Sequence, residues 1–174
     1  MTMQWLQGTG TIGAGNLGFI DFNNLPSEYS HLQIRYSVRD TGAFTTRGMF
    51  MEFNFNSTGY NEHYLKGNGS AASSQSYTPL TRFDWGELPA ASATANTFGV
   101  GIVDIYDFNS TTKNKTVKIF HGYDLNGSGE VNLWSGVWKN NAAITNIRMY
   151  SNNAFVQNSR LDLYGFRTST STGG

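Results

Sequence analysis

The chain has 174 residues and no cysteine, and its 12 Lys and Arg residues balance its 12 Asp and Glu residues. This length suits one domain with a hydrophobic core, and the lack of cysteine excludes disulfides, thiolate metal sites and cysteine nucleophiles. Only 14% of the residues are charged, against about 25% in typical soluble domains. A neutral, weakly charged chain has no broad field for nucleic acid or anionic lipid, so we expect neither partner.

Residues 1–18 are rich in glycine, with Trp5, Leu6, Ile12 and Leu17 as the apolar points. Two interpretations fit this pattern: an edge strand with bulges, or an extended arm that packs on a neighbouring subunit. The start has no basic segment followed by an apolar run, so we expect no signal peptide and synthesis in the cytoplasm. No stretch approaches the roughly 20 apolar residues of a membrane helix, so we expect no membrane partner.

Side chains alternate between apolar and polar along most of the remaining chain, which is typical of half-buried strands. Residues 32–38 place Leu32, Ile34, Tyr36 and Val38 on one face. In residues 49–55 the apolar face consists of Met49, Met51, Phe53 and Phe55. Residues 98–108 form a longer apolar run, which predicts a strand buried on both faces over part of its length. Further strands are expected at 116–123, 131–138, 144–150 and 161–167.

Turn-forming residues separate these strands. Asn126-Gly127 predicts a hairpin between the strands at 116–123 and 131–138. Residues 151–153 are expected in a turn, residues 67–75 in a long surface loop, and residues 89–95 in a loop or a single helical turn. We therefore predict an all-β, single-domain antiparallel β-sandwich over residues 19–167, followed by a flexible tail at 168–174.

Sequence motifs for catalysis or metal binding are absent. His121 shares a strand face with Val117 and Ile119, so a hydrogen-bonded histidine of the sheet is expected rather than a ligand. The segment 124–130 starts like a calcium loop but has Ser135 where the twelfth-position carboxylate is required, which favours a turn. The acids Glu52, Glu62, Asp84, Glu87, Asp104 and Asp107 are available for hydrolysis, but no spacing pairs any two of them. We predict no catalytic residue, no metal, no cofactor and no enzymatic activity.

Four tryptophans are candidates for contact with a partner or with a glycan: Trp5, Trp85, Trp134 and Trp138. Trp134 and Trp138 share one face of a predicted strand. That face is either the core, or an outer surface on which paired aromatic rings would indicate binding.

Several segments resemble tailed-phage virion proteins with a jelly-roll-like domain. The resembling segments are residues 25–39, 88–105, 115–118, 122–129, 135–138, 143–147 and 161–166. The resemblance implies a jelly-roll-like sandwich on the surface of a virion and supplies no catalytic residue. Because the chain has no long fibrous stem, it favours a capsid decoration (cement) protein, a homotrimer that bridges and stabilises capsomers of the major capsid protein. The alternative is a receptor-binding module on a tail or head fibre that recognises a host surface glycan.

Overall fold

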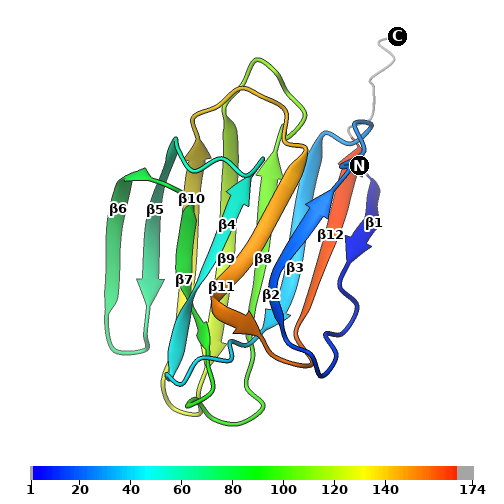
Figure 1. The fold of residues 1–174 in the computed structure, drawn as a ribbon. Helices are drawn as coiled ribbons and strands as arrows, with labels where there is room; N and C mark the ends of the chain where they lie inside the picture. The colour runs from blue at the N-terminus through cyan, green and yellow to red at the C-terminus, as the bar shows by residue number, and fades with distance from the viewer. Residues whose placement is uncertain (1, 168–174) are drawn as a thin grey trace.

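The computed structural model describes residues 2–167, and in that range it contains twelve antiparallel strands in two packed sheets and no helix (Figure 1). The predicted all-β sandwich is thereby confirmed. An eight-stranded sheet has the order β1-β12-β3-β8-β9-β10-β5-β6, and a four-stranded sheet has the order β2-β11-β4-β7. The strands are β1 (Thr2–Gly8), β2 (Leu17–Asn23), β3 (His31–Val38), β4 (Thr46–Phe53), β5 (Tyr60–Gly67), β6 (Ala72–Leu80), β7 (Phe83–Pro89), β8 (Gly99–Tyr106), β9 (Lys115–Asp124), β10 (Gly129–Trp138), β11 (Asn146–Phe155) and β12 (Arg160–Arg167).

The core fills the space between the sheets, because most strands turn one set of alternating side chains inward. In β9, Val117 and Ile119 are buried while Phe120 is exposed. An aromatic cluster occupies the centre of one half of the core. Its rings contact one another at centroid separations of 4.9–6.4 Å, and its members are Phe53, Tyr60, Phe83 and Trp138.

A chain of buried hydrogen bonds ties the two sheets together. Trp85 in β7 donates from Nε1 to the Tyr36 hydroxyl at 3.0 Å, and that hydroxyl lies 2.9 Å from Nδ1 of His121. His121 Nε2 lies 2.5 Å from the carbonyl of Glu87. Since a carbonyl only accepts, His121 carries its proton on Nε2, and the Tyr36 hydroxyl donates to Nδ1. Burial lowers the pKa of His121. The prediction of a hydrogen-bonded sheet histidine is confirmed.

The first residues form an edge strand within the chain itself. β1 pairs with β12, with a register shift between Trp5 and Gln7, and the segment that follows leads into β2. Thr2–Gly8 thus pair with their own sheet in this structure rather than extending as an arm. The predicted tail at 168–174 lies outside the described residues.

Four local predictions were wrong. The loop expected at 67–75 spans only residues 68–71, because β6 begins at Ala72. The turn expected at 151–153 lies inside β11, which bulges there. Phe55 leaves the buried face, since β4 ends at Phe53 and Phe55 has a φ of +53° and is 57% exposed. The strand at 98–108 buries only one face, because Val100 is 54% exposed.

The hairpin prediction at Asn126-Gly127 is confirmed. Both residues have positive φ, +66° and +110°, and they join β9 to β10. Asn and Gly tolerate this left-handed backbone better than other residues. Asp124 caps the turn by accepting a hydrogen bond from the backbone N–H of Asn126. Among the described residues, no group of three or more acidic, His or Cys side chains is arranged to hold a metal ion.

Candidate functional site: an inter-sheet cleft and an apolar sheet face

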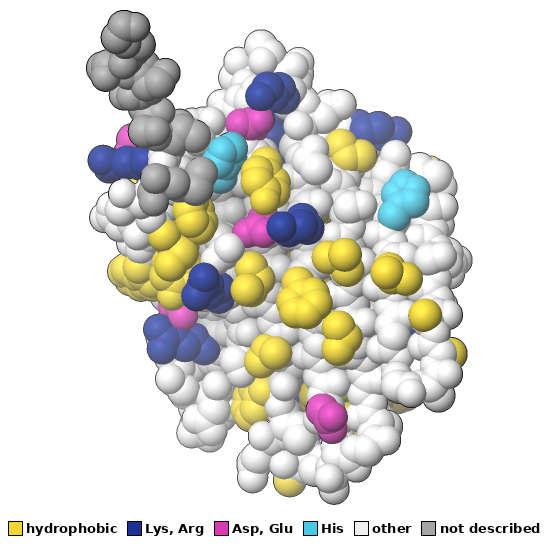
Figure 2. Space-filling model, turned by 180° about the vertical axis from the view of Figure 1, so that it is seen from behind, with side chains coloured by type: hydrophobic (Ala, Val, Ile, Leu, Met, Phe, Trp, Pro, Cys, Tyr) yellow, Lys and Arg dark blue, Asp and Glu magenta, His cyan; other side chains and the backbone are white. Residues whose placement is uncertain are grey.

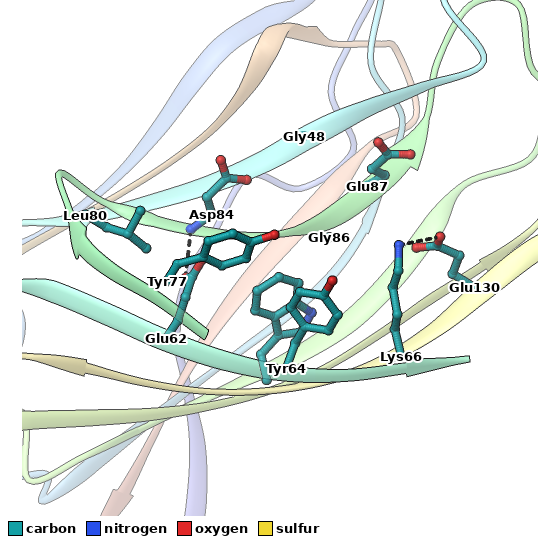
Figure 3. A pocket seen from close by; sticks show the side chains of 11 residues that line it. Gly48, Glu62, Tyr64, Lys66, Tyr77, Leu80, Asp84, Gly86, Glu87 and Glu130 are labelled. Carbon is teal, nitrogen blue, oxygen red and sulfur yellow. Dashed lines mark hydrogen bonds and ion pairs between the residues drawn. The ribbon is translucent and has the colours of Figure 1, made fainter. Parts of the chain in front are cut away.

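The larger sheet extends past the smaller one, so β5 and β6 lie beyond the edge formed by β7 (Figure 1). A cleft of about 430 Å³ opens there between the sheets (Figure 3). The lining residues come from β5, β6 and β10 on one side and from β4 and β7 on the other. They are Gly48, Glu62, Tyr64, Lys66, Tyr77, Leu80, Asp84, Gly86, Glu87, Glu130 and Trp134.

Aromatic rings line the side of the cleft formed by the larger sheet. Tyr64 packs on Trp134 with 4.5 Å between ring centroids, and Tyr77 lies 6.1 Å from Tyr64. Trp134 is only 5% exposed, whereas Tyr77 is 36% exposed at the rim. The aromatic lining therefore runs from the buried floor to the solvent.

Glu62 is the buried carboxyl group of the cleft, with only 2% of its surface exposed. One oxygen, Oε2, accepts a hydrogen bond of 3.1 Å from the backbone N–H of Asp84 (Figure 3). Burial raises the pKa of Glu62 to about 8, and the nearby Asp84 charge adds to this, while the hydrogen bond from Asp84 opposes it. Glu62 is therefore mainly protonated at neutral pH.

Two buried polar atoms of the cleft residues have no hydrogen-bond partner within the chain. They are Oε1 of Glu62, an oxygen, and Nε1 of Trp134, an N–H donor. Buried polar atoms are nearly always paired in folded proteins, so each such atom needs an explanation.

The remaining charged groups of the cleft are partly neutralised. Lys66 pairs with Glu130 at 2.9 Å, and this hydrogen bond raises the pKa of Lys66. Glu87 accepts a hydrogen bond from the Thr46 hydroxyl. Asp84 projects away from Tyr77 on the opposite side of β7 in Figure 3. The cleft thus contains more carboxyl groups than cations.

Only one of the four candidate tryptophans lies in the cleft. Trp134 lines it, whereas Trp85 and Trp138 are at most 1% exposed and belong to the core, where neither a partner nor a glycan can reach them. Trp5 is 55% exposed on the edge strand β1, and its Nε1 donates to Asp162 at 3.2 Å. Trp134 and Trp138 do share a face, and that face points inward.

The structure brings together acids that the sequence could not pair. Glu62, Asp84 and Glu87 all line the cleft, whereas Glu52, Asp104 and Asp107 do not. Sequence reasoning missed the cleft residues Tyr64, Tyr77 and Lys66. The alternation Tyr60-x-Glu62-x-Tyr64 was the available indication, because it places Glu62 on the same strand face as two aromatic rings.

A second feature is a row of apolar side chains across the outer face of the larger sheet (Figure 2). Ile102 pairs in register with Phe120, Phe120 with Leu133, and Leu133 with Leu65. Phe120, Leu133 and Leu65 are 46–55% exposed. We call these four residues the apolar row.

Beside the apolar row the sheet face is hollow. The neighbouring register row runs from Val100 through Gly122 to Val131, and the two valines are 54% and 57% exposed. Because Gly122 has no side chain, a depression of about 770 Å³ lies over it, lined by these residues together with Ile102 and Phe120. The face therefore offers both projecting and recessed apolar surface.

On the outer face of the smaller sheet, arginine side chains lie over the aromatic rings. The Arg148 guanidinium lies 4.1 Å from the ring centre of Phe19 and 4.8 Å from that of Phe55, and Arg82 lies 3.8 Å from that of Phe50. In residues 2–167, no cationic side chain stacks on Phe120. Among the described residues, the exposed rings of Phe19 and Phe55 thus have a cation over them, whereas Phe120 has none.

Comparison with known proteins returns no matching family model, no matching curated protein and no matching solved structure. In the described part of the chain, no helix is long and apolar enough to cross a membrane.

Proposed function

We propose that the chain is a structural protein of a phage particle, a capsid decoration protein that binds neighbouring shell subunits through the outer face of its larger sheet. The observation that carries this proposal is the apolar row, with the hollow beside it. Contiguous exposed apolar surface of this kind marks contact sites in soluble proteins. The sequence resemblance to virion proteins supports the particle setting.

The sequence pattern of β8 supports the same surface. Its apolar run is that of a strand buried on both faces, yet within the chain Val100 and Tyr106 remain 54% and 41% exposed. A protein neighbour over this face would complete the burial. One charged pair on this face, Lys118 and Asp104, is already joined at 3.3 Å, and the Arg35 guanidinium beside the hollow lies over the Tyr164 ring.

The test uses a matched pair of exposed leucines on opposite sheets. Leu133→Lys places a charge in the apolar row, and Leu17→Lys does the same on the outer face of the smaller sheet, where Leu17 is 39% exposed against 46% for Leu133. Leu133→Lys removes about 1–2 kcal/mol of apolar contact and adds the cost of desolvating a lysine. Together these two effects should weaken association at least tenfold.

The measurement is co-sedimentation of each purified variant with phage particles that lack the chain. We expect wild type and Leu17→Lys to bind the particles and Leu133→Lys to stay in the supernatant. Equal binding by the two variants, or no binding by wild type, would overturn the proposal.

A further inference from the structure

We propose that two copies of the chain pair along β6, antiparallel about a two-fold axis at Gln75, so that their larger sheets join into one. The contact uses the edge of the sheet and not its outer face. The inference therefore goes beyond the proposed function and is tested independently of it.

β6 presents a free backbone edge. It is the last strand in the order of the larger sheet, with β5 on one side only. In antiparallel sheets the N–H and C=O groups of alternate residues point to opposite sides of a strand, so half of these groups in β6 point away from the sheet. β5 and β6 lie beyond β7, so the smaller sheet does not cover this edge (Figure 1). Every residue from Ala72 to Pro79 is exposed.

The edge at β6 lacks the features that usually prevent strands from pairing between molecules. Charged side chains and bulges are the common ones. Among the edge strands of the described sheets, β2 carries Asp21 and β7 carries Asp84. β1 is uncharged, but a register shift interrupts its pairing with β12. β6 has no charged residue, and its register with β5 is unbroken from Ala72 to Tyr77.

The sequence of β6 is complementary to itself in the antiparallel direction. With Gln75 on the two-fold axis, Ser74 lies opposite Ser76, and the small Ser73 lies opposite the large Tyr77. Each such pair occurs twice, and both of its members point to the same face, as an antiparallel ladder requires. Serine hydroxyls opposite each other can also form hydrogen bonds across the strands.

The same axis uses the whole regular part of the strand. It pairs Ala72 with Thr78 at each end and leaves Pro79 outside the ladder, where its missing N–H costs no hydrogen bond. A two-fold contact of this kind closes after two copies, because each copy uses its only β6. The occupant of the edge is therefore a second copy of the chain, and the product is a dimer.

The first test is the mass of the full chain by sedimentation equilibrium. One pair of strands is a small contact, and small contacts associate weakly, so the series runs from about 10 µM to about 500 µM. Gln75→Lys places two like charges opposite each other on the axis and should raise the dimer dissociation constant at least tenfold. Gln4→Lys in β1 is the matched control, since Gln4 and Gln75 are both exposed glutamines that accept a hydrogen bond from a tyrosine hydroxyl.

The second test fixes the register with single cysteines. The chain has no cysteine, so an introduced one can form a disulfide only with another copy. Gln75→Cys should cross-link under mild oxidation, because residues paired on the axis lie within reach of a disulfide. Ser73→Cys should not, because the two copies of residue 73 are about 13 Å apart along the strands.

The proposal predicts dimers of wild type and of Gln4→Lys, monomers of Gln75→Lys with an unchanged circular dichroism spectrum, and cross-linking at residue 75 only. A wild type that stays monomeric at every concentration, or that forms trimers, would overturn it. So would a dimer that Gln75→Lys leaves intact, or cross-linking at residue 73 as efficient as at residue 75.

Discussion

Replacing Glu62 by glutamine should remove part of the pH dependence of stability. Glu62 has a pKa of about 8 in the folded protein, raised by burial from an ordinary value of 4.5. Between these values the unfolded chain releases the proton that the folded protein retains, so wild-type stability falls as the pH rises. Glutamine keeps the shape of the side chain and has no proton to release.

The magnitude follows from the size of the shift. One titrating group changes the free energy of unfolding by about 1.4 kcal/mol per pH unit inside the window. From pH 5 to pH 8, wild type should therefore lose on the order of 3 kcal/mol relative to Glu62→Gln. His121 acts in the opposite direction, because its lowered pKa costs stability as the pH falls below its ordinary value of 6.5. That contribution is common to both proteins and cancels in their difference.

The assay is urea denaturation followed by tryptophan fluorescence at pH 5, 6, 7 and 8. Glu28→Gln serves as the control, because Glu28 forms only an exposed ion pair with Arg167 at 3.4 Å, and such pairs contribute little to stability. The gap between Glu62→Gln and wild type should widen with each pH step. A gap that stays constant from pH 5 to pH 8 would refute the reasoning about a buried, protonated Glu62.

Two further substitutions test the buried polar network. Tyr36→Phe leaves Trp85 Nε1 and His121 Nδ1 without a partner, so the free energy of unfolding should fall by about 1–3 kcal/mol in denaturant titrations; an unchanged midpoint would contradict the hydrogen-bond chain. Asp40 is fully buried and accepts hydrogen bonds from the Ser151 hydroxyl and from backbone N–H groups. Asp40→Ala should cost about 2–4 kcal/mol, and a thermal midpoint equal to that of wild type would contradict it.

The sequence predicted the central strands of the larger sheet because each has one buried and one exposed face. The expected strand at 116–123 matches β9, and that at 131–138 matches most of β10. Alternation is strong wherever one face meets the core. It could not tell which face of β10 points inward, since that depends on how the sheet packs against the other one.

Three of the strands that build the cleft, β5, β6 and β7, were not revealed by the sequence. β6 is an edge strand whose residues are almost all exposed and small or polar, so no buried face marks its sequence. β7 contains Gly86 at a φ of +64° and ends at Pro89, residues that usually interrupt strands. Without β5, β6 and β7 in place, Glu62, Asp84 and Glu87 could not be assigned to one site.

The asparagines also acquire a structural explanation. Most of the non-glycine residues with positive φ are asparagines, at turns and bulges: Asn16, Asn24, Asn54, Asn96, Asn126 and Asn158. Asparagine tolerates the left-handed region better than other side-chain-bearing residues. Tight connections therefore account for these six asparagines.

Cryo-electron microscopy of phage particles that carry the chain tests the central claim most directly. We predict density for the sandwich at many equivalent positions of the shell, with Phe120, Leu133 and Leu65 buried against a neighbouring subunit. Copies confined to the tail, or an apolar row that faces solvent in the assembled particle, would contradict the account.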